Sequence, residues 1–327
     1  MLPPKGGGRV ADSLERQAGF SGFAGRTLQS RNEGCIVNSS PSSSSKESSA
    51  FAFVTMLAGE LSKGKVDLPS FPDVAQRVRK ALQDEDVSAD KIVRIVGAEP
   101  SLAARLIQLA NSAGVNVGGR HTTDLRVAIA RIGLNLVRSS TIVYAMSQLT
   151  KSEALRSVRE PLRTLWQRSA LVAAMASVVA RRHTKVNPDA AALAGILHGL
   201  GKLYILVNAV KYPEMFSDPE GYSEIEQLWH ANIAKALLEN WDMTDDVVTA
   251  VHLHEDYDYS HEGDTDLTDV LLIANLMATY REHPEDIELN LQGVRPAHRI
   301  RLDGASFKKL LTESGSEIEA LRSALGS

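Results

Sequence analysis

Cysteine and aromatic residues are scarce in this sequence of 327 residues. The single cysteine, Cys35, cannot form an intramolecular disulfide or a cysteine-rich zinc module, and so few cysteines are typical of a reducing compartment. No apolar run approaches the roughly 18 residues of a transmembrane helix, and the N-terminal positions lack the apolar region of a signal peptide. We therefore expect a cytoplasmic protein without a membrane partner.

Alternating apolar and polar residues, which would predict strands, are also missing, and no repeat recurs at a fixed period. From about residue 68 onward, apolar residues instead recur every three or four positions, which is the spacing of helices. Residues that start or stop helices frame these runs. They are Ser88 and Asn187 as N-caps, a Ser223–Glu226 capping box, and Gly133 as a break. The sequence therefore predicts an all-α fold of about eleven helices.

Residues 1–55 have a composition that cannot build a core. They contain a glycine triplet, and eight of the eleven residues from 39 to 49 are serine. Such a segment has too little apolar surface to offset the loss of chain entropy on folding. We expect a disordered leader over residues 1–55, with Met56 as an alternative start of the chain.

The net charge of −4 hides an uneven distribution of charge along the chain. Residues 68–182 carry seventeen Lys and Arg against nine Asp and Glu, or +8, whereas residues 183–327 carry eleven against twenty-five, or −14. This difference predicts two lobes, a basic one over residues 65–182 and an acidic one over residues 183–285. Residues 286–327 are too few for a further domain and predict a helical extension.

Six segments resemble, in order, the HDOD domain, the HD-related output domain of bacterial signalling proteins. The segments are residues 68–72 (LPSFP), 99–106 (EPSLAARL), 109–113 (LANSA), 128–134 (AIARIGL), 166–169 (WQRS) and 193–202 (LAGILHGLGK). The resemblance covers about residues 65–285. It implies a two-lobed all-α domain with an HD-like helical bundle in its C-terminal lobe, and a role in a bacterial signalling pathway.

Metal-dependent phosphohydrolases of the HD type are similar in fold to this family, and they hold one or two divalent metals with His and Asp side chains. By this resemblance Arg168 occupies the position of the first histidine ligand. Gly199 follows His198 where an aspartate would be, and Asn275 replaces a distal aspartate. Glycine offers no ligand atom, an amide is a weak ligand, and arginine adds positive charge. We therefore expect no catalysis, no metal and no cofactor.

Three histidines remain at this relic site: His198, His230 and His254, the last followed by Glu255. Three neutral imidazoles could hold a zinc ion, which would give a residual phosphohydrolase acting on a nucleotide or another phosphoester. More often, a buried histidine at the end of an apolar helix donates one ring nitrogen to a carbonyl and packs with the rest of its surface. The sequence favours this second interpretation.

Charged residues supply candidate surfaces for a partner. Arg105 and Arg131 lie within apolar helical runs, where they could bind an anion or act as partly buried donors to backbone carbonyls. Aromatic residues that could stack on bases are rare in the basic lobe, so a nucleic-acid or nucleotide-binding regulator is the weaker alternative. Residues 244–269 contain nine acidic residues and no Lys or Arg, and Asp256, Asp258 and Asp264 within them predict an exposed surface for a basic protein partner.

These features together predict a non-catalytic regulatory module that transmits a signal through protein–protein contact. The resemblance implies the signalling role, and the replaced ligand positions imply the lack of hydrolysis. The residual phosphohydrolase and the nucleic-acid or nucleotide-binding regulator remain as alternatives.

Overall fold

The computed structural model describes residues 41–326, with gaps at residues 65, 67–72, 83, 85–86, 112–115, 117–118, 150, 284–285, 288–290 and 292. Every regular element that it describes is a helix, which confirms the all-α prediction. In chain order these elements are α2 (Pro41–Ser62), α3 (Asp73–Leu82), α4 (Ala89–Gly97), α5 (Pro100–Ala110), α6 (Leu125–Leu149), the 3-10 helix η1 (Glu153–Val158), α7 (Arg159–His183), α8 (Pro188–Leu197), α9 (Leu200–Ala209), the 3-10 helix η2 (Pro213–Ser217), α10 (Pro219–Asn240), α11 (Asp245–His252), α12 (Leu267–Thr279), α14 (Arg295–Ile300) and α15 (Gly304–Gly326).

Local sequence signals account for several helix boundaries. The Ser88 side chain accepts a hydrogen bond from the backbone of Lys91 at the start of α4, and Asn187 caps α8 in the same way. Gly133 interrupts α6 with a φ of 76°, a conformation that favours glycine. The predicted Ser223–Glu226 capping box is wrong. α10 begins about a turn earlier, at Pro219, because Asp218 caps it and proline suits a first helical turn.

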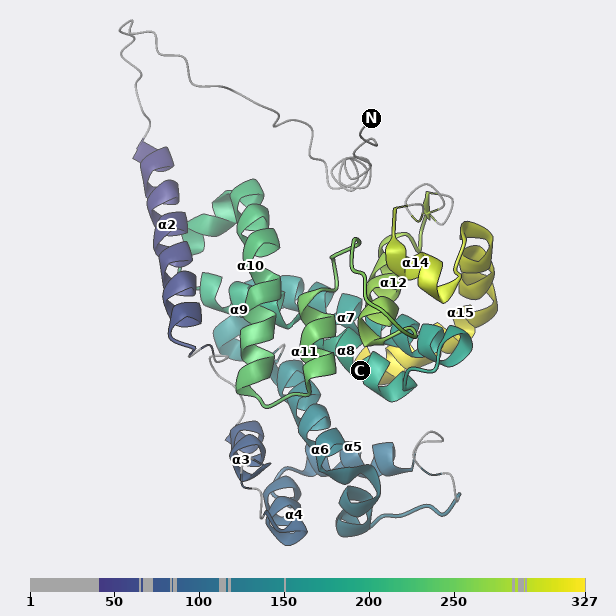
Figure 1. The fold of residues 1–327 in the computed structure, drawn as a ribbon. Coiled ribbons are helices and arrows are strands. Elements are labelled where there is room, and N and C mark those ends of the chain that lie inside the picture. Colours follow the sequence, from purple (N-terminus) through teal and green to yellow (C-terminus); the bar gives the residue numbers. More distant parts are fainter. Residues whose placement is uncertain are drawn as a thin grey trace, which may run out of the picture.

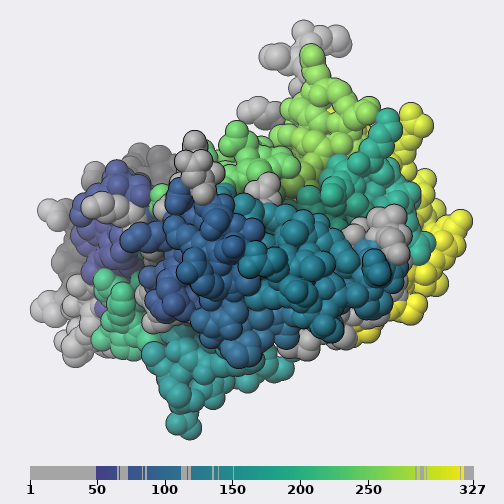
Figure 2. Space-filling view, turned by 90° about the horizontal axis from the view of Figure 1, so that it is seen from below, coloured from purple at the N-terminus to yellow at the C-terminus, as the bar shows by residue number. Residues whose placement is uncertain are grey.

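Two apolar cores divide the chain into lobes. The small lobe consists of α3, α4, α5 and part of α6, and the other described helices build the large lobe. In Figure 2, which views the molecule from below, the small lobe lies across the middle of the face, with α2 on one side and α15 on the other. On α6, Arg138 donates hydrogen bonds to the carbonyls of Leu82 in the small lobe and Asp242 in the large lobe.

The predicted lobe boundary near residue 182 is wrong, because α7 belongs to the large lobe. Its alanine-rich half packs so closely on α8 that a Cβ at Gly195 would lie 2.4 Å from the Cα of Ala173. α15 also packs along α7 and places Phe307 and Leu310 in the same core, so the predicted C-terminal extension is an integral part of the large lobe. The division by charge therefore differs from the division by packing.

The predicted disorder of residues 1–55 is wrong for residues 41–55, and residues 1–40 lie outside the described residues. The helix α2 lies beside α10 and η2 (Figure 1). Phe53 and Leu57, four positions apart on one helix face, are fully buried. The ring of Phe53 packs edge-on against Tyr212, with centroids 5.4 Å apart. The average composition of this serine-rich segment gave no indication that these two side chains are buried.

One stretch of the described residues, Pro188–Ala209, is long and apolar enough to span a membrane by length and composition, which differs from the expectation that no apolar run approaches that length. Most of it is buried in the fold, and it consists of two helices, α8 and α9, with Gly199 between them. Core helices have the same composition, and these two lie in the core of the large lobe.

Candidate functional site: the histidine cluster

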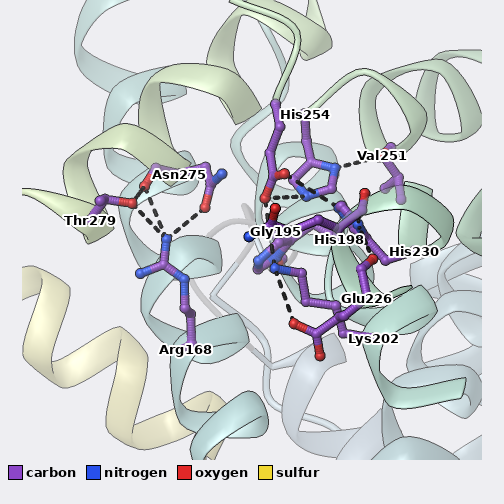
Figure 3. Close-up of polar contacts among 12 residues, drawn as sticks. Arg168, Gly195, His198, Lys202, Glu226, His230, Val251, His254, Asn275 and Thr279 are labelled. Carbon is purple, nitrogen blue, oxygen red and sulfur yellow. Dashed lines mark hydrogen bonds and ion pairs between the residues drawn. The ribbon is translucent and has the colours of Figure 1, made fainter. Parts of the chain in front are cut away.

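The structure brings together His198, His230 and His254 in the large lobe (Figure 3). His198 follows the last turn of α8, His230 lies in α10, and His254 comes just after α11. The ring of His254 is 5.3 Å, centroid to centroid, from each of the other two rings. All three side chains are buried. The three histidines therefore form one cluster, which we call the histidine cluster.

Each of these histidines uses Nδ1 in a bond to a carbonyl of its own helical turn. His198 contacts the carbonyl of Gly195 at 2.6 Å, His230 that of Glu226 at 2.8 Å, and His254 that of Val251 at 2.7 Å. Because a carbonyl can only accept, Nδ1 carries the proton. In a neutral imidazole, Nε2 then keeps its lone pair and can act as a ligand or an acceptor.

Glu255 reaches the same cluster, although no sequence pattern assigns it a role there. Its carboxylate oxygens lie 3.5 Å from Nε2 of His230 and 3.5 Å from Nε2 of His254. Lys202 on α9 places Nζ 3.8 Å from Glu255 and 3.8 Å from Glu226. The only sequence signal for Glu255 is its place directly after His254. Lys202 and Glu226 come from helices that tertiary packing brings together, so no local pattern points to them.

The surroundings keep His198 and His230 neutral and Glu255 charged. Burial lowers the pKa of His198 well below its ordinary value, and burial together with the charge of Lys202 lowers that of His230 to about 4 despite the nearby Glu255 carboxylate. Burial alone would raise the pKa of Glu255, but the polar groups around it, with the charge of Lys202 among them, hold it far below its usual range. The site thus combines neutral imidazoles at His198 and His230 with an ionised carboxylate and an ammonium group.

On the other side of the site, Arg168 points at Asn275 (Figure 3). Its Nη2 donates to Oδ1 of Asn275 at 2.8 Å and to the hydroxyl of Thr279 at 2.8 Å. Burial lowers the pKa of Arg168, whereas the charge of Glu255 favours its charged form. The guanidinium thus contacts the residue that stands at the distal aspartate position.

The dinuclear metal centre of HD-type phosphohydrolases does not fit these residues. Gly199 has no ligand atom, and a Cβ added there would lie 2.6 Å from the hydroxyl oxygen of Ser169. Asn275 already accepts from Arg168, which would repel a cation placed beside it. The positions that would hold two metals are therefore filled by a glycine, an amide and a cation.

The two predicted arginines of the basic surface lie in the small lobe, apart from the histidine cluster. Arg131 donates to the carbonyls of Ala110 and Arg120, each at 3.0 Å. This arginine therefore ties the end of α5 and the following loop to α6, as a partly buried structural donor. Arg105 is half-buried, and burial lowers its pKa.

The acidic stretch of residues 244–269 is only partly a surface. Asp256, Asp258 and Asp264 are exposed, as expected, and Asp264 lies 3.4 Å from Lys185. Asp269 differs because it is fully buried and lies 2.9 Å from His261 and 3.3 Å from Arg299. It also completes the capping box at the start of α12. A helix cap and an ion pair account for its burial, which charge counting could not detect.

The HDOD domain family profile matches residues 68–257, more than half of the chain. This chain belongs to the HDOD domain family. The assignment agrees with the observed lobes and with the position of the histidine cluster inside the matched region. The exposed acidic residues Asp258 and Asp264 lie just beyond it.

Comparison with solved structures supports the same fold. A Shewanella amazonensis SB2B protein, named as a proposed metal-dependent phosphohydrolase, has a TM-score of 0.64 and 26% identity over 84% of this chain and 99% of that chain. An HDOD domain protein of unknown function from Geobacter sulfurreducens has a TM-score of 0.52 and 22% identity over 85% of this chain and 97% of that chain. The second likeness shows the fold alone.

Among curated proteins, an uncharacterised protein of Treponema pallidum (strain Nichols) is 24% identical over 276 residues. The aligned region covers 79% of this chain and 49% of that protein. The chain therefore spans about half the length of this relative.

Proposed function

We propose that this HDOD protein is a regulatory signal-transduction module that binds another protein and does not hydrolyse phosphoesters. The observation that carries the proposal is the guanidinium of Arg168, which bonds to Asn275 and Thr279 beside the histidine cluster. Hydrolysis by two metals needs carboxylates that bridge and screen the cations. A fixed positive charge without those carboxylates disfavours a dinuclear centre.

The partner surface that we propose is the loop between α11 and α12, which Figure 1 shows in green. Its exposed carboxylates, those of Asp256, Asp258 and Asp264, suit a basic face on a bacterial signalling protein. Exposed charges act at long range and are screened by salt, so association should weaken as ionic strength rises. Nucleic acid is disfavoured as a partner, because this loop repels it and Arg131 is already bonded to backbone carbonyls.

The test compares proteins that co-purify with the full chain and with the triple variant D256K/D258K/D264K. The matched control E224K/E239K/E313K changes the net charge equally at exposed positions elsewhere on the large lobe. We expect the first variant, and not the control, to lose the partner and its salt dependence. Equal binding by the wild type and both variants would remove the loop from the proposed function.

A residual metal-dependent phosphohydrolase is the second candidate. The inward-facing Nε2 atoms favour it, as does the name of the Shewanella relative. Turnover of phosphomonoesters or cyclic dinucleotides that is abolished by His198→Ala would support this candidate and contradict the non-catalytic proposal. We expect no such turnover, because the dinuclear ligand set is incomplete.

A further inference from the structure

Two buried nitrogen atoms in the histidine cluster lack hydrogen-bond partners among the residues that the structure describes. They are Nε2 of His230 and Nε2 of His254, on side chains that are 3% and 0% exposed. A buried polar atom without a partner is costly, so native proteins rarely leave two of them side by side without a ligand or water between them. This pair of atoms indicates something that binds to both.

The arrangement of the surrounding atoms indicates a cation. The two Nε2 atoms and a Glu255 carboxylate oxygen all lie within 4.8 Å of one another, and each Nε2 is 3.5 Å from the carboxylate. Ligands around a tetrahedral zinc, with bonds of about 2.1 Å, lie roughly 3.4 Å from each other. The two separations of 3.5 Å, which run to different oxygens of Glu255, are too long for strong hydrogen bonds and are close to the spacing of ligands around one ion.

The protons of the cluster also favour a cation over direct hydrogen bonds. Nδ1 of His230 and Nδ1 of His254 already donate to the carbonyls of Glu226 and Val251. Nε2 of a neutral imidazole therefore has no proton to give to Glu255, and two acceptors face each other.

We infer that His230, His254 and Glu255 form a binding site for a single divalent transition-metal ion of the zinc or ferrous class. Two imidazoles and one carboxylate are a ligand set that both ions accept. The site uses Glu255, which the sequence analysis had not assigned to the metal, and needs neither Gly199 nor Asn275. It revises the expectation that the cluster holds no metal, and it does not depend on hydrolysis.

Lys202 is a nearby cation that opposes this ion. It pairs with both Glu226 and Glu255, and its side chain is 26% exposed. Glu226 can therefore remain paired with the ammonium group of Lys202 when Glu255 binds the metal. The ion would hold Glu255, the residue that begins the acidic loop, against α10. This last consequence, metal control of the partner surface, rests on the proposed function, whereas the metal site itself does not.

The experiment uses the full chain, stripped with a chelator and titrated with Zn²⁺ in air or with Fe²⁺ under anaerobic conditions. Elemental analysis and calorimetry should find one ion per chain for at least one of the two metals. Free metal at a hundred times its dissociation constant should raise the melting temperature of the protein by roughly 5 °C. Neither readout involves a partner or a substrate, so failure of the metal site is distinguishable from failure of the regulatory role.

Three variants test the ligands. His254→Gln and Glu255→Gln should each weaken metal affinity at least about tenfold, whereas Lys202→Met should tighten it because the competing charge is gone. His252→Gln is the matched control, since this neighbouring histidine contacts Asn232 instead. If His254→Gln fails to fold, the result for Glu255→Gln decides whether the metal site exists. The side chain of Glu255 is 43% exposed, so its substitution should not prevent folding. Metal content far below one ion per chain, or equal affinity in wild type and Glu255→Gln, would overturn the inference.

Discussion

His261 places Nε2 2.9 Å from Oδ2 of Asp269 and Nδ1 3.0 Å from the backbone carbonyl of Glu262. Both partners are acceptors, so both ring nitrogens are satisfied only when the imidazole is protonated. Arg299 shares the same aspartate oxygen and also donates to the carbonyl of His261. These bonds fasten the end of the acidic loop to α12 and α14.

The first prediction is a pH-dependent contribution of His261 to stability. Burial alone would lower its pKa, but the hydrogen bond to Asp269, the Glu262 carbonyl and the nearby carboxylates together raise it above the ordinary 6.5. Its contribution is therefore complete below pH 6.5 and is lost as the pH rises through the raised pKa. We expect the difference in unfolding free energy between wild type and His261→Gln to be largest at acidic pH and to shrink at alkaline pH. Chemical denaturation across this pH range measures it.

The measurement must compare wild type with His261→Gln, because the buried histidines change the free energy of unfolding with pH in the opposite direction. Burial lowers the pKa of His198 and His230, so protonating them at low pH destabilises wild type and His261→Gln alike. The difference between the two proteins removes that shared effect. A difference that stays constant with pH would contradict a charged His261.

The second prediction concerns the helix α2, with two phenylalanines as a matched pair. Phe53 is fully buried, whereas Phe51, two positions away, is 75% exposed. Phe53→Ala should reduce the free energy of unfolding by about 3–5 kcal/mol, because it removes a buried ring and leaves a cavity. Phe51→Ala should change it by no more than about 0.5 kcal/mol. Equal small effects would support the disordered leader that the composition of residues 1–55 predicts.

Sequence signals predicted the fold where the cause was local. Ser88 and Asn187 cap helices through their own side chains, and Gly133 breaks α6 through its own backbone. Sequence signals failed where contacts between distant segments determine the structure. The extent of the large lobe depends on the approach of α7 to α8, and the burial of Phe53 depends on Tyr212, which lies far along the chain. Average composition and charge cannot report such contacts.

The third prediction tests that close approach of α7 and α8. Gly195→Ala would place a Cβ 2.4 Å from the backbone of Ala173, so the helices must separate. We expect a loss of about 1–3 kcal/mol in unfolding free energy. Gly59→Ala in α2 is the control because nothing lies within 4 Å of its added Cβ, and there the substitution should be neutral or stabilising by up to about 1 kcal/mol. Thermal and chemical denaturation of both variants compare the two, and an equal response would contradict the close packing of α7 on α8.

The candidate site was predicted in part for a similar reason. The resemblance identified His198 within the segment of residues 193–202, and it implied His230 and His254 as the other histidines of the relic site. It did not assign Glu255, whose role follows from the direction of its side chain. Nor could it show that Arg168 bonds to Asn275 across the site. Replaced ligands can be recognised in a sequence, but new partners become visible only when helices from distant segments meet.

The last prediction is that Arg168 holds α7 to α12. Arg168→Met keeps much of the apolar stem but removes the donor to Asn275 and Thr279. Since Asn275 is buried, its side-chain oxygen then loses its hydrogen bond, and we expect a loss of about 2–3 kcal/mol in unfolding free energy.

Arg163→Met is the matched control for that substitution. Arg163 lies on the same helix, α7, and pairs only at the surface with Glu160, so its loss should cost at most about 1 kcal/mol. Chemical denaturation of both variants measures the difference, and equal losses would show that the bonds of Arg168 do not stabilise the site. Arg168→Met should also leave the metal content unchanged, because Gly199 still offers no ligand atom beside His198. A second bound ion in this variant would mean that the arginine charge alone had excluded it, so that a dinuclear centre needs fewer carboxylates than we infer.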